Sequence, residues 1–309
     1  MDTKELFRNY LQVQKRYSPR TLELYMKSVE ELYGFLSPQE GEQAESLLQP
    51  KHIRAFTAQL LKTGYSPVTV NLKLSAISTY CNLLVKKGLL KSNPVKKIHR
   101  PKNEKRLPGF YTADAMEGYF DYEKDTKEVG EEVFPEDFLK LRDRVLTELL
   151  YCTGIRRAEA ASLKLFDFDK KRGVVRVTGK GDKSREVPVP DDFSMALAGY
   201  IELQKDFYSD NSGKYLFLTD SGQPMYLSFV NKVVKRELSG KAGFSGKKSP
   251  HMLRHSLATH LLNNGADLNS IKEVLGHSSL AATQVYTHNS FEKLKKVFLT
   301  AHPRAKKGG

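Results

Sequence analysis

The sequence predicts a mainly α-helical protein with a small antiparallel sheet, an α+β chain divided into two domains. The length of 309 residues exceeds one ordinary domain and suits two, each with its own core. Apolar residues recur at helical spacing through the first hundred residues. The clearest alternation of apolar and polar residues lies at residues 173–190, around a glycine-rich turn, which is typical of a β-hairpin.

The charge balance favours a polyanionic partner. Fifty Lys and Arg against 36 Asp and Glu give a net charge of +14 and a pI near 9.5, so nucleic acid and an anionic membrane are the candidate partners. No run of 18 apolar residues or signal-peptide core is present, so we expect a cytoplasmic protein with no membrane span. Cys81 and Cys152 stand in apolar helical contexts and are predicted to be reduced packing residues.

Residues 1–93 are predicted to form a helical domain. Ser18 and Ser66 are each followed by proline, and this pair of residues is typical of a helix N-cap and first turn. Four helices are expected, over residues 3–16, 18–36, 51–64 and 66–88.

Residues 94–108, PVKKIHRPKNEKRLP, contain three prolines and six Lys or Arg, which predicts a basic linker. Such a linker either follows a phosphate backbone or is a solvated tether. Residues 109–309 would then form the second domain. Its acidic stretch at 121–137 would repel a polyanion, so we expect a loop away from it, with a partner contact as the alternative.

Two basic clusters punctuate this domain. In TGIRRAEA, Arg156 and Glu159 are three residues apart and share a helix face, either as a phosphate ligand with its orienting acid or as a surface ion pair. In TGKGDKSR, Lys180 lies at the predicted hairpin tip. This segment is not a Walker loop, because its spacing differs and a strand follows it, so an ordinary basic turn is the alternative.

Two further clusters contain histidine. In HMLRHS, His251 and Arg254 are three apart at the start of a predicted core helix. A zinc site of the protease type is disfavoured, because Met252 stands where its glutamate would be and no third ligand is evident. Farther on, GHSSLAATQVYTH places His277 nine residues before Tyr286, which is either a core side chain or a nucleophile.

Together these clusters contain the groups needed for transesterification at a phosphodiester. A tyrosine with a pKa of about 10 is only about 0.1% ionised at neutral pH, so Tyr286 would need a base, for which His251 is a candidate. Lys180 could protonate the departing 5′ oxygen. The pentavalent transition state gathers negative charge, and the candidate stabilisers are Arg156, Arg254 and His277.

The motif order TGIR, GKG, HMLR, LGH, Tyr resembles the tyrosine recombinase (phage integrase) family. The similarity extends from YSPRTLELY near the start through PKNEKRLP to AHPRA at the end, and the HPRA ending, with no added N-terminal arm-binding domain, resembles the Xer branch. The resemblance assigns Glu159 a supporting role. It implies a catalytic set of Arg156, Lys180, His251, Arg254, His277 and Tyr286.

The resemblance also implies a C-shaped clamp on double-stranded DNA, formed by a helical core-binding (SAM-like) domain and a catalytic domain. Tyr286 would form a 3′-phosphotyrosyl intermediate on the way to a Holliday junction, without cofactor, metal or ATP. A C-terminal exchange helix would link protomers into a homo- or hetero-tetramer on an inverted-repeat site. Resolution of chromosome dimers at cell division, aided by a septal DNA translocase, is the expected task.

Other interpretations keep part of this chemistry. An integrase or excisionase of a mobile element and a type IB topoisomerase would use the same residues for another task. A phosphatase or nuclease would release its product without a covalent adduct. A non-catalytic DNA-binding relative is disfavoured, because all six catalytic positions are intact.

Overall fold

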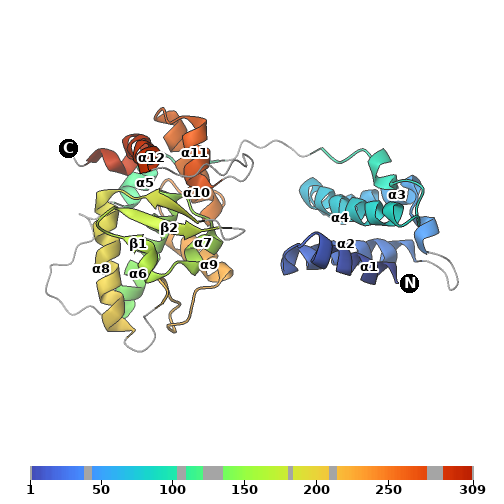
Figure 1. Cartoon of the computed structure of the whole chain (residues 1–309), viewed down its shortest axis with the longest axis horizontal. Helices are drawn as coiled ribbons and strands as arrows, with labels where there is room; N and C mark the ends of the chain where they lie inside the picture. The colour runs from blue at the N-terminus through green and yellow to red at the C-terminus, as the bar shows by residue number, and fades with distance from the viewer. Residues whose placement is uncertain are drawn as a thin grey trace. The chain divides into compact units, whose positions relative to one another are not determined.

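The computed structural model of the chain describes residues 2–37, 44–102, 109–120, 135–179, 184–208, 214–276 and 288–307 (Figure 1). It forms two compact units, Met1–Leu107 and Pro108–Gly309. Each unit has its own hydrophobic core. None of the helices in the described ranges combines the length and the apolar character that a membrane crossing needs.

The first unit is helical. Its elements are α1 (Thr3–Asn9), η1 (Tyr10–Gln14), α2 (Pro19–Leu36), η2 (Ala44–Leu47), α3 (Pro50–Lys62), α4 (Pro67–Lys86) and η3 (Pro94–Lys97). The predicted N-caps are confirmed, because the hydroxyls of Ser18 and Ser66 each accept a hydrogen bond of 3.3 Å from a backbone N–H three residues on. The helix expected over residues 3–16 is interrupted, since η1 is a π-helical turn.

Facing sides of these helices form the core of the first unit. Its fully buried residues include Phe7, Leu32, Ile53, Leu74 and Ile77. Burying a side chain of this kind stabilises the fold by about 1.5–3 kcal/mol. Cys81 lies in the same core, and burial raises the pKa of its thiol to about 12, which confirms the prediction that it is a packing residue.

The first part of the predicted linker packs on the first unit. The side chain of Asn71 in α4 donates a hydrogen bond of 2.9 Å to the carbonyl of Pro101, and Arg100 donates one of 2.9 Å to the Ser75 hydroxyl. Val95 is buried. The basic side chains of Lys96, Lys97, Arg100 and Lys102 are exposed. This stretch therefore presents positive charge from an anchored backbone.

The second unit surrounds one long helix. Its elements are α5 (Ala113–Tyr119), α6 (Pro135–Thr153), α7 (Arg157–Ser162), η5 (Leu165–Asp167), β1 (Phe168–Asp169), β2 (Val174–Thr178), β3 (Ser184–Pro188), α8 (Asp191–Phe207), α9 (Leu227–Leu238), α10 (Pro250–Asn263), α11 (Leu268–Leu275), α12 (His288–Ala301) and η6 (Pro303–Lys307). Helix α6 packs against α8, α9 and α10 (Figure 1). It begins at Pro135, so the end of the expected acidic loop is helical; residues 121–134 lie outside the described ranges.

The predicted hairpin is confirmed as β2 and β3, with β1 added on the outer side of β2 in an antiparallel sheet. Its register pairs Val177 with Arg185 and Arg176 with Glu186. Because paired residues share a face and neighbours alternate, Arg185 lies on the face of the buried Val177, and Arg176 lies on the opposite one. This register directs Arg185 inward.

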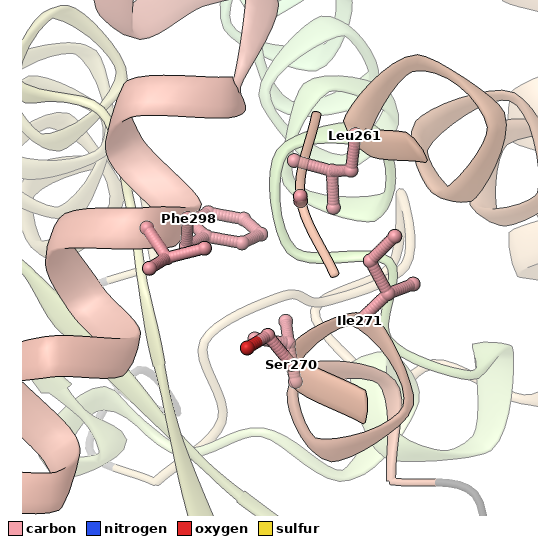
Figure 2. Close-up of a pocket in the computed structure, with 7 residues that line it drawn as sticks. Leu261, Ser270, Ile271 and Phe298 are labelled. Atoms are coloured by element: carbon pink, nitrogen blue, oxygen red, sulfur yellow. The ribbon is translucent and has the colours of Figure 1, made fainter. Parts of the chain in front are cut away.

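The C-terminal helix α12 packs on its own chain in this structure. Phe298 and Ala301 are buried in the core of the second unit, and Arg304 in η6 forms an ion pair with the buried Glu148 of α6. Where α12 meets α10 and α11, a small pocket remains, lined by Leu261, Ala266, Ser270, Ile271, Val274, Val297 and Phe298 (Figure 2). Ser270 is its one polar lining residue, so this pocket does not suit an anionic substrate.

Candidate active site

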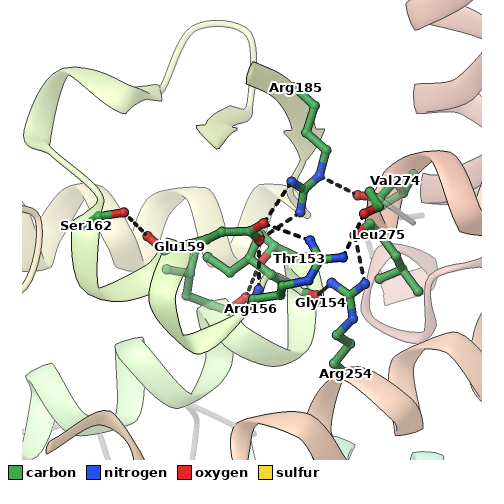
Figure 3. Close-up of polar contacts among 12 residues, drawn as sticks. Thr153, Gly154, Arg156, Glu159, Ser162, Arg185, Arg254, Val274 and Leu275 are labelled. Carbon is green, nitrogen blue, oxygen red and sulfur yellow. Dashed lines mark hydrogen bonds and ion pairs between the residues drawn. The ribbon is translucent and has the colours of Figure 1, made fainter. Parts of the chain in front are cut away.

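Four charged side chains from three segments of the second unit converge at the C-terminal end of α11 (Figure 3). They are Arg156 and Glu159 at the start of α7, Arg185 on β3, and Arg254 on α10. The cluster contains three guanidinium groups and a single carboxylate, so this arginine cluster has an excess of positive charge. Such a cluster can bind an anion by charge-assisted hydrogen bonds.

Gly154, in the turn between α6 and α7, allows the helices to approach each other. A Cβ atom at this position would lie 2.5 Å from Leu275 Cδ2 and 2.9 Å from Leu257 Cδ2, and its backbone has a φ of +59°. Only glycine meets both conditions without strain. The TG dipeptide therefore does more than end a helix, since it allows α10 and α11 to pack against the turn that leads to Arg156.

Glu159 is the acceptor at the centre of the cluster. Its carboxylate accepts hydrogen bonds from the backbone N–H of Arg156 at 2.8 Å and from Arg156 Nη1 at 2.9 Å. Arg185 donates to both of its oxygens, at 3.2 and 3.0 Å. Burial tends to raise the pKa of Glu159, but these bonds outweigh it and hold the pKa below its ordinary value. The predicted Arg156–Glu159 pair is present, with a third member that the spacing did not reveal.

Arg156 combines anchoring with access to solvent. Besides its bonds to Glu159, it donates through Nη2 to the carbonyl of Gly276 at 2.7 Å. Its side chain is still 45% exposed. A partly exposed guanidinium with a fixed orientation is suited to contact a ligand that approaches from solvent.

Arg254 is more deeply placed, with 7% of the residue exposed. It donates through Nη1 to the Gly154 carbonyl at 2.6 Å and through Nη2 to the Leu275 carbonyl at 2.8 Å. Burial, together with the positive charges of Arg156 and Arg185, lowers its pKa to about 10, so it remains protonated at neutral pH.

His251 lies one turn before Arg254 on α10, as their spacing of three residues predicts. The two side chains differ in solvent exposure, since His251 is exposed and Arg254 is buried. A zinc site would need further ligands, and within the described ranges no three His, Cys, Asp or Glu side chains are grouped closely enough to hold a metal ion. Lys180, His277 and Tyr286 lie outside the described residues.

Gly276 ends α11 and precedes His277 in the chain. It is in the left-handed conformation, with a φ of +66°, and its N–H closes the helix by bonding to the carbonyls of Lys272 and Glu273. The path of the backbone as it leaves α11 is therefore defined up to the residue before His277.

Arg185 is the member of the cluster that sequence reasoning missed. A charged residue opposite Val177, on the buried face of the hairpin, was the available signal. Alternation along KSREVPVP puts it there, but a strand pattern alone does not distinguish an inward arginine from an edge position.

Comparison with known proteins is informative for the whole chain. Residues 124–293 match the phage integrase family, and residues 5–88 match the phage integrase N-terminal SAM-like domain. The tyrosine recombinase XerC of Bacillus subtilis is 37% identical over 312 residues, covering 97% of this chain and 96% of that protein. XerC of Chlorobaculum tepidum is 33% identical over 312 residues, covering 96% and 93%.

Solved structures share the fold. The Tn1549 transposon integrase in complex with transposon right end DNA has a TM-score of 0.68 at 17% identity, covering 96% of this chain and 99% of that one. The XerH site-specific recombinase bound to its difH substrate has a TM-score of 0.65 at 20% identity, covering 95% and 82%.

The chain therefore belongs to the phage integrase family, as its motifs indicated. Within this family it is a tyrosine recombinase of the Xer type, an enzyme of site-specific recombination.

Proposed function

We propose that the chain cuts and rejoins double-stranded DNA through a covalent bond between Tyr286 and a 3′ phosphate. The observation that carries this proposal is the convergence of Arg156, Arg185 and Arg254 on the end of α11, next to His277 in sequence. Cationic groups held in advance of the reaction stabilise the charge of a pentavalent phosphate, and loss of one such group typically slows a reaction about 100- to 1,000-fold.

In this proposal each residue has one role. The Tyr286 oxygen attacks phosphorus and releases a 5′ hydroxyl, while His251, exposed to solvent at the start of α10, accepts the tyrosine proton. Lys180 donates a proton to the departing 5′ oxygen. The negative charge is stabilised by Arg156, Arg254 and His277, and Glu159 orients Arg156. Attack by a 5′ hydroxyl of another strand on the phosphotyrosine reverses the step and joins new partners.

The proposed assembly follows the relatives. The solved neighbours include recombinases bound to DNA, and one is a lambda integrase tetramer bound to a Holliday junction, with a TM-score of 0.63. We expect two domains, bounded near 93 and 109, to grip an inverted-repeat site from two sides, in a homo- or hetero-tetramer. Docking of α12 onto a neighbouring protomer would require it to leave the cis position described above. Resolution of chromosome dimers in the cytoplasm, aided by a septal translocase, is the proposed task.

The proposal is tested by trapping the covalent intermediate. Wild type and Tyr286→Phe are mixed with a library of nicked suicide duplexes, built as inverted repeats around a random centre, and adducts that resist detergent are isolated. Wild type is expected to give an adduct whose phosphate maps to Tyr286 by peptide mass, and sequencing of the trapped DNA yields the preferred site. Tyr286→Phe is expected to bind that DNA with unchanged affinity and give no adduct.

Tyr226→Phe is the matched control, because Tyr226 is 51% exposed at the start of α9 and makes none of the contacts of the arginine cluster. It is expected to form the adduct at the wild-type rate. An equal adduct from Tyr286→Phe would refute the nucleophile assignment. Tight binding without any adduct from wild type would favour a non-catalytic DNA-binding relative instead.

A further inference from the structure

Arg185 makes hydrogen bonds that a residue does not need in order to bind a phosphate. Its Nε donates to the carbonyl of Val274 at 2.9 Å, and its two Nη atoms donate to the two oxygens of Glu159. The side chain is 11% exposed, against 45% for Arg156. All three of its guanidinium nitrogens thus donate to its own chain, which is the arrangement of a group that holds other groups in place.

The end of α11 is held by three arginines in succession. Arg185, Arg254 and Arg156 donate to the carbonyls of residues 274, 275 and 276, respectively. The last carbonyls of a helix have no partner within the helix, and its negative end attracts cations. Each arginine therefore stabilises a different point of the backbone that leads to His277.

Removal of Arg185 would disturb this backbone directly. Arg156 keeps two bonds to Glu159 without it, one from its backbone N–H and one from its side chain. Arg185 itself fills the space that a side chain on residue 276 would occupy. Its guanidinium carbon would lie 2.9 Å from a Cβ atom at this position. Loss of Arg185 leaves a gap at the helix end and the carbonyl of Val274 without this donor.

We infer that Arg185 is a positioning residue for strand cleavage, which holds the end of α11, the segment that leads in sequence directly to His277. It joins β3, α7 and α11 through one planar guanidinium. A lysine has a single donor atom and cannot reproduce two bonds to Glu159 and one to Val274 at once. This inference rests on the proposed function, because it assumes that His277 takes part in cleavage.

The test is a double-mutant cycle on the full chain, with Arg185→Met made in wild type and in His277→Ala. The single-turnover cleavage rate and the dissociation constant are measured on the suicide duplex selected above. In the wild-type background, Arg185→Met is expected to slow cleavage about 100-fold, since displacement of a reacting group by about 1 Å costs that much. DNA affinity should not change. In the His277→Ala background the added loss should be much smaller, because both changes remove the same contribution.

Arg176→Met is the matched control. Arg176 stands on the neighbouring strand β2, on the opposite face of the hairpin, with its side chain 58% exposed and Glu186 4.0 Å away. It is expected to cleave at the wild-type rate. Thermal melting verifies that each variant is folded at the assay temperature. Arg185→Lys, expected to be slower than wild type but faster than Arg185→Met, replaces it in the cycle if the methionine variant is unfolded.

The outcomes separate the two proposals. Equal slowing by Arg185→Met in both backgrounds, or no slowing in wild type, overturns the positioning role while cleavage by Tyr286 stands. No loss of rate in His277→Ala alone contradicts the role proposed for His277, and the inference about Arg185 then fails with it. Adduct formation by Tyr286→Phe contradicts the proposed function whatever Arg185 does.

Discussion

Arg185 and Gly276 are in such close contact that a Cβ atom on residue 276 would lie 2.9 Å from the guanidinium carbon of Arg185. Gly276 also has a φ of +66°, which side chains with a Cβ rarely adopt. Two independent constraints therefore require glycine at this position, one from the backbone and one from packing.

Gly276→Ala is expected to destabilise the second unit. The left-handed conformation alone costs about 1–2 kcal/mol for a residue with a Cβ, and displacement of Arg185 adds to it. The free energy of unfolding is measured with urea. Gly199→Ala is the control, because Gly199 lies within α8 with open space at its Cβ position and no positive φ. The free energy of unfolding of Gly199→Ala should rise by about 1 kcal/mol, because alanine has a higher helix propensity than glycine. A similar decrease in the free energy of unfolding in both variants would contradict the packing argument.

Glu159→Gln is expected to lower the free energy of unfolding by about 3–5 kcal/mol at pH 7, because it removes the anion from a buried ion pair. The pKa of Glu159 is depressed in the folded state, so its contribution is present above its ordinary pKa and is lost as the pH falls through the folded value. Urea unfolding of both proteins at pH 7 and at progressively lower pH should show the difference shrinking. Glu186→Gln, which disrupts a more exposed pair with Arg172, should cost less than about 1 kcal/mol.

His302 should make folding sensitive to acid. It is fully buried, and burial, with the nearby His260, lowers its pKa to about 3. Its neutral form is favoured in the folded state, so stability is complete above its ordinary pKa of 6.5 and falls with pH below it, by about 1.4 kcal/mol per pH unit. In His302→Leu, the free energy of unfolding should depend less steeply on pH between pH 6 and 4. Substitution of the exposed His99 by Leu should leave that slope unchanged.

Lys96 and Lys97 are expected to bind the phosphate backbone. The double variant with glutamine at both positions should bind every DNA sequence more weakly. It should also reduce the slope of log affinity against log salt by about 0.9 for each phosphate that is no longer neutralised. Titrations at several salt concentrations measure this slope. The exposed Lys140 and Lys205, changed to glutamine together, provide a control of equal charge. Identical slopes for wild type and the Lys96–Lys97 variant would show that these two lysines do not contact the phosphate backbone of the DNA.

Local patterns in the sequence predicted local structure well. Ser18 and Ser66 cap their helices as expected, because an N-cap bond involves residues only three apart. The Arg156–Glu159 pair was predictable for the same reason. The hairpin followed from its alternation, and the family from motifs spread along the chain.

Contacts between distant segments were not predictable. Arg185 meets Glu159 and Val274 only because β3, α7 and α11 come together in the folded unit, and no spacing in the sequence encodes that approach. The burial of Arg254 beside an exposed His251 likewise depends on which turn of α10 is covered by α11. The π-helical turn at Tyr10–Gln14 has no signal that helix periodicity could detect.

The crowding of arginines has a consequence for the lifetime of the protein. The pKa of Arg254 is lowered by burial first and then by the positive charges of Arg156 and Arg185, so the three guanidinium groups repel one another. Any polyanion bound there relieves this repulsion and stabilises the folded unit by mass action. Copies engaged on their substrate should therefore resist unfolding and proteolysis, while idle copies are the first to be degraded.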